Sequence, residues 1–333
     1  TFVLINIFCL RINLNADSLF PYRYVSSLQS GNPYLLYVQP GSRIFPDWIY
    51  SYIAYFFAQD LIPWSRAVIG FNILVLMYSV SFLFNSFKFH PAQKTLWTVV
   101  LVLCLPVLYL AHKNVLIYFI FSPGVHGFYV PFLFVALGTY YRFICNPTTP
   151  KKLTFFMFIL GGVLVSSNLN FVVMTISPIV TTTFYLRFLN KLNTKQLLYV
   201  IWYAVLMSLL GLILSYLVQN SFEQIYFSAN HFKLFKLNLF EWLQENNLFK
   251  EVMNRKTSGY WLEITYMSTI SSMAIIFRNK SSRVTPVYIL NLFFLFSIPT
   301  FLISTWVLDK GVIRLMPHLI LLSPFILIFN ITK

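Results

Sequence analysis

Acidic residues are rare in this chain, and two of them bracket its first polar stretch. Asp17 follows an apolar run in NADSLFPYRY, and Asp47 opens the next run in RIFPDWIYSY. A carboxylate at the mouth of a membrane helix can accept a proton from a sugar hydroxyl or hold a cation, because partial desolvation raises its basicity. Asp17 also fits a solvated loop residue, and Asp47 a helix N-cap. Both are candidate catalytic residues.

A cationic group stands near the other end of the chain. Lys310 and Arg314 lie in LDKGVIRLMPH, and His318 closes that stretch. An arginine can fork onto a phosphate, and a lysine can add a point charge to it. Both cations also fit side chains that snorkel from a helix end. We assign these three residues to substrate binding.

Two further polar residues stand at the edges of apolar runs. Glu263 lies just inside a run in SGYWLEITYM, where an unpaired charge would cost at least a few kcal/mol, so it needs a partner or a water-filled cavity. His126 lies in FSPGVHGFY, where a neutral imidazole could orient a phosphate or a hydroxyl, or serve a structural role. Both are candidate substrate-binding residues. Asp60 is expected to be a helix cap or to pair with Arg66.

The composition excludes a water-soluble domain. Hydrophobic residues make up 58% of the 333 positions and charged residues only 10%, whereas soluble domains carry roughly 25% charged residues. The net charge of +15 comes from short Lys and Arg clusters between apolar runs, which favours membrane topology and anionic lipid over nucleic acid. The chain starts inside an apolar stretch, so we take it for an N-terminally truncated piece of a longer protein.

The fold class predicted is all-α, a polytopic transmembrane helical bundle of about 10 to 12 spans, with 1–333 as a single membrane domain. Helix is expected because a bilayer forces every backbone group to pair within its own segment. The runs long enough to span are approximately 46–63, 65–87, 95–111, 126–144, 153–168, 170–188, 197–218, 259–277, 285–307 and 318–331.

The basic clusters predict the topology. Those at 151–152, 187–195 and 278–283 are expected on the cytoplasmic side. The clusters place 219–258, 308–317 and the His126 turn on the outer side. For residues 14–46 to lie on that same side, the stretch from Lys88 to His126 must cross twice, through a short or re-entrant segment at VLIYFIF.

Two outer loops are large enough to contribute to a site. The first covers 14–47 and contains SLFPYRYVSSLQSG, which can form a short interfacial helix. The second covers 219–258, where Phe232, Phe235, Leu239, Trp242 and Leu243 recur at helical spacing. That spacing is typical of a helix that lies in the membrane surface.

No nucleotide or hydrolase motif is present. The sequence has no GxxxxGK[ST] phosphate loop, no HExxH and no GxSxG, so an ATPase, a zinc protease and a serine hydrolase are unsupported. Cys9, Cys104 and Cys145 sit in or beside apolar runs without pair spacing and fit small core residues.

The layout resembles the GT-C membrane glycosyltransferases. The resemblance is carried by Asp17 directly after the first span, by FPDW at the next, by the His126 turn and by Arg314 in DKGVIRLMPH. That last stretch is similar to the family's C-terminal arginine-containing loop, with Leu315 in place of an aromatic residue.

The resemblance implies an inverting transfer of a sugar from a polyprenyl-phosphate carrier to a saccharide or lipid acceptor at the outer membrane face, in the bacterial inner membrane. Asp17 would be the general base, Asp47 would bind the acceptor or support Asp17, and Arg314 with His126 would hold the departing phosphate. No metal or other cofactor is expected. The alternatives are a transporter or flippase for a lipid-linked saccharide, and a non-catalytic membrane assembly subunit.

Overall fold

The computed structural model describes residues 16–31, 48–99, 129–145, 151–168, 171–221, 261–278, 284–308 and 317–331. Within these ranges the regular structure is entirely helical, as the sequence predicts. The elements are α2 (Ala16–Ser30), α3 (Ile49–Phe57), α4 (Leu61–Ser86), α7 (Val130–Cys145), α8 (Lys151–Ser167), η3 (Val172–Ile176), α9 (Ser177–Phe188), α10 (Thr194–Ser221), α14 (Trp261–Arg278), α15 (Pro286–Leu308) and α16 (Pro317–Ile331).

Length and hydropathy identify a membrane protein. Three helices are long and apolar enough to cross a bilayer, namely residues 61–86, 194–217 and 286–303. Shorter apolar helices at 130–145, 153–167, 172–188 and 322–331 accompany them. Several helices have a proline in their first turn, where a backbone N–H has no partner within the helix and its absence costs nothing. These prolines are Pro63, Pro131, Pro178, Pro286 and Pro317.

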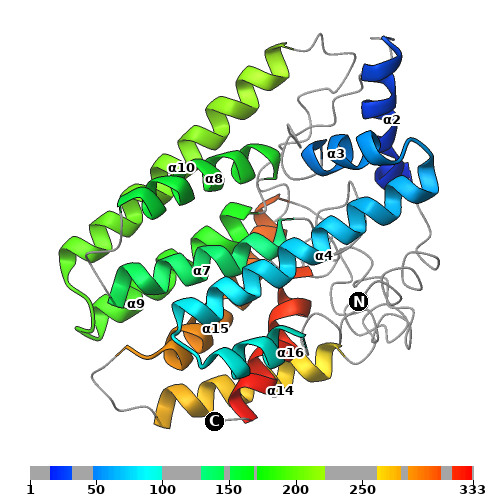
Figure 1. Cartoon of the computed structure of the whole chain (residues 1–333). Helices are drawn as coiled ribbons and strands as arrows, with labels where there is room; N and C mark the ends of the chain where they lie inside the picture. Colours follow the sequence, from blue (N-terminus) through cyan, green and yellow to red (C-terminus); the bar gives the residue numbers. More distant parts are fainter. Residues whose placement is uncertain are drawn as a thin grey trace.

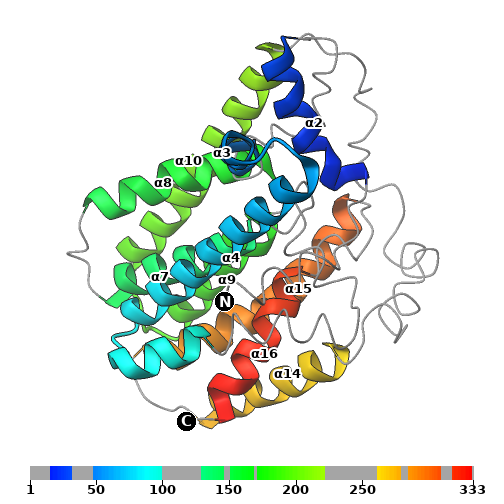
Figure 2. The same ribbon diagram turned by 45° about the vertical axis from the view of Figure 1, so that its right-hand side comes forward.

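The helices form three adjacent groups (Figure 1). Helices α8 and α10 lie along one side, α4, α7 and α9 fill the middle, and α14, α15 and α16 lie on the other side. Figure 2 shows the same grouping from a second direction. The largest buried cluster joins α4, α7, α15 and α16 and includes the ring pair Phe84–Phe325, with centroids 5.7 Å apart. Helix α10, by contrast, buries only 17% of its apolar window, so most of its surface is left for lipid.

One end of the bundle collects basic residues. The ends of α4 and α7 meet through the rings of Phe87 and Tyr141, whose centroids lie 4.9 Å apart. The end of α7 also contacts the start of α10, because the Gln196 amide donates to the Ile144 carbonyl at 3.2 Å. This basic end holds nine of the eleven Lys and Arg residues in the described part: Lys88, Lys94, Arg142, Lys151, Lys152, Arg187, Lys191, Lys195 and Arg278.

The turn between α9 and α10 is firmly built into the basic end. Asn193 and Gln196 form reciprocal backbone bonds of 2.8 and 3.0 Å, which cap the start of α10. The Lys191 ammonium lies 4.0 Å from the ring centroid of Tyr288 at the start of α15. Burial lowers the pKa of this ammonium from its ordinary value. The lysines of this turn therefore belong to an ordered surface.

The predicted span 46–63 is wrong. Residues 49–57 form the nine-residue helix α3, about 14 Å long and far short of the bilayer core. Helix α3 ends because Ala58 and Asp60 both adopt extended backbone angles, and α4 starts afresh at Leu61. Helix α3 then packs against the first half of α4, where the Trp64 indole donates to the Ser51 carbonyl at 3.0 Å.

This correction removes the double crossing expected after α4. Because α3 does not span, α4 begins on the side away from the basic end and delivers Lys88 to that end, where Lys94 donates to Asn85 at 2.8 Å. Helix α7 then starts on the far side, since its last residues lie at the basic end. Lys88 and Tyr129 therefore lie at opposite ends of the bundle, so their positions require no double crossing. The proposed re-entrant segment lies outside the described residues.

Candidate functional site

The described acidic residues all stand toward the end of the bundle that faces away from the basic end, here called the opposite end. In the described part of the chain the acidic residues are Asp17 on α2, Asp60 before α4 and Glu263 in the first turn of α14. Two arginines, Arg23 and Arg66, share this end. Among the described residues the opposite end is therefore close to neutral, while the basic end carries nine cations.

Helix α2, which carries Asp17, is fixed over the corner between α3 and α4. The predicted helix in this stretch is present, from Ala16 to Ser30. The Tyr22 hydroxyl donates to the Gln59 carbonyl at 2.8 Å, and its ring lies 5.1 Å from that of Trp64. Burial first, and then the nearby Tyr55 and Asp60, raise the pKa of Tyr22. Asp17 stands five residues before this anchor on the same helix.

Asp60 does not pair with Arg66. It is the N-cap residue of α4, but its exposed side chain makes no capping bond, and its backbone carbonyl alone accepts from Trp64 at 2.9 Å. No ion pair joins it to Arg66 in the part of the chain that the structure describes. Asp60 thus stands at a helix end as expected, but in the described residues its side chain makes neither a capping bond nor the ion pair.

Glu263 and His318 start two helices that run side by side in the same direction. Thr265 and Ser323 share a hydrogen bond of 2.9 Å, and the Ser268 hydroxyl donates to the Ser323 carbonyl at 2.7 Å. Glu263 is exposed in the first turn of α14, and His318 is the second residue of α16. These two predicted binding residues therefore share the opposite end.

The same two helices continue into a polar network toward the basic end. Asn330 donates to Asn291 at 2.8 Å and to Ser271 at 3.0 Å, and it accepts from Asn291 at 3.1 Å. These bonds join α16 to α15 and α14. Hydrogen bonds between membrane helices stabilise their association where apolar burial alone contributes little.

Four predicted site residues lie outside the described residues: Asp47, His126, Lys310 and Arg314. Their described neighbours occupy the opposite end. Trp48 directly precedes α3, Tyr129 directly precedes α7, Leu308 ends α15 and Pro317 starts α16. The expected helix within 219–258 also lies outside the described residues, apart from the end of α10. A single transfer reaction predicts that Asp17 and Arg314 lie within roughly 15 Å of each other across one outward-facing cavity, and this stays a prediction.

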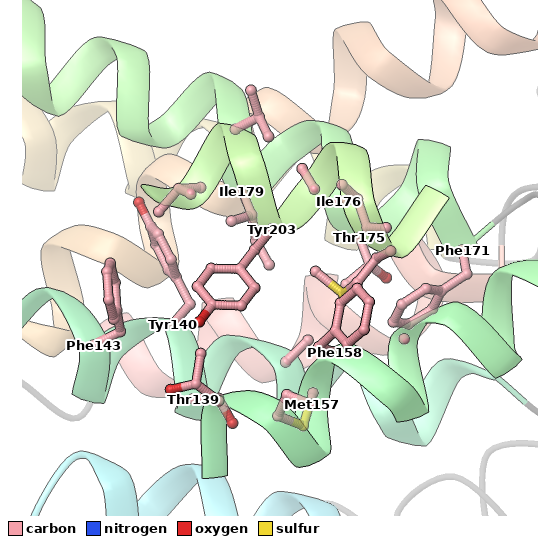
Figure 3. Close-up of a pocket in the computed structure, with 17 residues that line it drawn as sticks. Thr139, Tyr140, Phe143, Met157, Phe158, Phe171, Thr175, Ile176, Ile179 and Tyr203 are labelled. Atoms are coloured by element: carbon pink, nitrogen blue, oxygen red, sulfur yellow. The ribbon is translucent and has the colours of Figure 1, made fainter. Parts of the chain in front are cut away.

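A separate apolar slot, not anticipated from the sequence, lies between α7, α8, α9 and α10 (Figure 3). Its volume is about 100 Å³, and its walls are almost wholly apolar. The lining residues are Ala136, Thr139, Tyr140, Phe143, Thr154, Met157, Phe158, Gly161, Phe171, Thr175, Ile176, Ile179, Val180, Val200, Tyr203, Ala204 and Met207.

Two polar side chains in the wall of this slot differ in their bonding. The Tyr140 hydroxyl shares a 2.7 Å bond with Thr183, which in turn donates to the Ile179 carbonyl. Thr175 is fully buried, and its hydroxyl has no partner in the described structure. Thr175 lies in the π-helical turn η3, a type of turn that often occurs at functional positions.

Glycines hold α8 and α10 together beside the slot. A Cβ at Gly211 would lie 2.9 Å from the Gly162 carbonyl oxygen and 2.5 Å from the Val165 Cβ. Small residues allow this close approach of membrane helices. Gly161, Gly162 and Gly211 within apolar runs are a sequence signal for close packing of α8 on α10.

Comparisons with protein-family models, with curated proteins and with solved structures find no match to this chain. In the described ranges, no three His, Cys, Asp or Glu residues gather to hold a metal ion.

Proposed function

We propose that this chain is a multi-pass glycosyltransferase of the GT-C type in the bacterial inner membrane. It moves a sugar from a polyprenyl-phosphate carrier to a saccharide or lipid acceptor at the membrane face formed by the opposite end. The observation that carries this proposal is the partition of charge along the bundle. Asp17, Glu263 and His318 come from distant parts of the sequence and lie at the end away from the basic cluster.

The reaction assigns each residue a step. The Asp17 carboxylate takes the proton of the acceptor hydroxyl as the hydroxyl oxygen attacks the anomeric carbon of the sugar. The bond from that carbon to the phosphate oxygen breaks, and the electron pair leaves with the polyprenyl phosphate. Arg314, with Lys310 and His126, stabilises the departing phosphate. Asp47, Glu263 and His318 orient the acceptor. Attack from the face away from the phosphate inverts the anomeric carbon.

The position of charge in the helices favours this enzyme over a transporter. A flippase that moves a charged saccharide carrier through the bundle would need charged side chains partway across the membrane. In the described helices other than α2, each Asp, Glu, Lys and Arg lies within two turns of a helix end. A non-catalytic assembly subunit remains the second alternative, and it predicts no product from a labelled carrier.

The test uses purified protein in lipid with a labelled polyprenyl-phosphate sugar, and it measures carrier binding and product separately. Asp17→Asn keeps the size of the side chain but removes the proton acceptor, so turnover should fall by roughly 10² or more while binding changes little. Arg314→Ala should weaken both. Asp60→Asn is the matched control, because this carboxylate shares the end of the bundle but makes no capping bond.

Two results would count against the proposal. Product formation by Asp17→Asn at the wild-type rate would exclude Asp17 as the base, and Asp47 would become the next candidate. Movement of the labelled carrier between leaflets with no transfer product from the wild-type protein would favour the flippase.

A further inference from the structure

The slot between α7 and α10 is elongated along the helices. Its lining runs over residues 136–143 of α7, 154–161 of α8, 171–180 of η3 and α9, and 200–207 of α10. At about 1.5 Å per residue, each wall is roughly 10 to 14 Å long. A narrow cavity of about 100 Å³ with that length has the shape of a single hydrocarbon chain, not of a sugar or a compact ring system.

The slot lies between helices that also carry apolar surface suited to lipid. Helices α8 and α10, which form two of its walls, carry large apolar side chains that point away from the bundle. Phe155 is 64% exposed and Trp202 is 60% exposed. Lipid chains therefore lie against both helices, parallel to the long axis of the slot. In Figure 3 the labelled lining residues surround an open space between these helices.

The end of the slot nearest the basic end has cationic neighbours. Thr154 and Val200 line it there, and Lys151 and Lys152 start α8 within one turn of Thr154. Lys195 is exposed in the first turn of α10. The bond from Gln196 to the Ile144 carbonyl holds this start of α10 against the end of α7. The N-termini of two helices, which favour anions, and the exposed Lys195 therefore lie near this end of the slot.

We propose that the slot holds one hydrocarbon chain of an anionic phospholipid from the leaflet at the basic end, with its phosphate at Lys195 and the starts of α8 and α10. The length of the slot favours a lipid tail, and Lys195 with the two helix N-termini favours a negative headgroup. This site is separate from the sugar-transfer site at the opposite end, and it does not depend on the proposed reaction.

The test counts bound lipid by native mass spectrometry after the purified, delipidated protein is exposed to mixed micelles of phosphatidylglycerol and phosphatidylcholine. The wild type should retain one phosphatidylglycerol in preference to phosphatidylcholine. Ala136→Phe should abolish retention, because the ring fills the slot. Lys195→Gln should reduce the preference for phosphatidylglycerol by about fivefold, as expected for one cation near a headgroup. Arg278→Gln should leave it unchanged, because this exposed arginine shares the basic end but lies on α14.

A second slot-filling variant, Ala204→Leu, enters from α10 and keeps the test decisive if Ala136→Phe does not fold. Equal retention of the two lipids by the wild type would overturn the proposal, as would full retention by a folded slot-filling variant. Displacement of phosphatidylglycerol by an equimolar amount of polyprenyl phosphate would assign the slot to the carrier and would also overturn it.

Discussion

Substitution of glycine by alanine should have opposite effects on stability at Gly211 and at Gly70. Both lie inside long helices, α10 and α4. A Cβ at Gly211 would lie 2.3 Å from Val165 Cγ1 and 2.9 Å from the backbone oxygen of Gly162. Since ordinary contacts begin near 3.4 Å, α8 and α10 would have to separate by about 1 Å. A Cβ at Gly70 meets nothing within 4 Å.

The magnitudes follow from these distances. Overpacking of this kind costs about 1 to 3 kcal/mol, and the backbone contact with Gly162 places Gly211→Ala toward the upper part of that range. Gly70→Ala should instead stabilise the protein by up to about 1 kcal/mol, because alanine favours the helix over glycine. The two variants should therefore differ in free energy of unfolding by about 2 to 4 kcal/mol.

The assay is unfolding in mixed micelles by increasing dodecyl sulfate, followed by far-ultraviolet circular dichroism. Gly161→Ala is a useful intermediate, because its Cβ would meet only the flexible side chain of Met207, which can move away. If Gly211→Ala were as stable as Gly70→Ala, the close glycine-mediated packing of α8 on α10 would be refuted.

Three further predictions concern polar groups. Asn330→Leu should lower the free energy of unfolding by about 2 kcal/mol, because it removes three bonds to Asn291 and Ser271 at about 0.6 kcal/mol each; the same micelle titration measures this. Thr175→Val should stabilise the protein by about 1 kcal/mol in that assay, because it removes a buried hydroxyl that has no described partner. The pKa of Tyr22 is raised in the folded protein, so the unfolded state loses this proton first and the free energy of unfolding falls as the pH rises above 10.0. Tyr22→Phe removes this proton, so the variant should lose less stability than the wild type at alkaline pH.

Each of these predictions has a clear contrary result. An unchanged midpoint for Asn330→Leu would show that the network contributes no stability. A loss of stability in Thr175→Val would show that the hydroxyl has a partner. Parallel alkaline unfolding curves for the wild type and Tyr22→Phe would remove any linkage of this tyrosine to folding.

The extent of most helices was predictable because each depends on an uninterrupted apolar run. The predicted spans 65–87, 153–168, 197–218 and 285–307 correspond closely to α4, α8, α10 and α15. The error at 46–63 arose because only three residues, 58–60, interrupt helix geometry there. Averaged hydropathy does not detect so short a break, whereas two extended backbone residues are enough to end a helix.

The candidate site was predictable only in its placement along the membrane normal. Charge clusters fix which end of a helix faces which side, so Asp17, Glu263 and His318 could be assigned to one end. The distances between these residues within the plane of the membrane depend on how the helices pack, and the hydropathy pattern of a single apolar run does not contain that information. The slot is another tertiary feature of this kind, since its lining residues, among them Ala136 and Thr175, come from several separate helices.

The charge partition also bears on how the chain is inserted into a membrane. The chain turns from α7 to α8, from α9 to α10 and from α14 to α15 between helix ends that all lie at the basic end. In the proposed topology each pair can enter the bilayer as a hairpin whose positive tip stays on the side of synthesis, so these turns need not be translocated. Reversing the charge of one tip, for instance Lys191 and Lys195, would then misorient a single hairpin and leave the others correctly inserted.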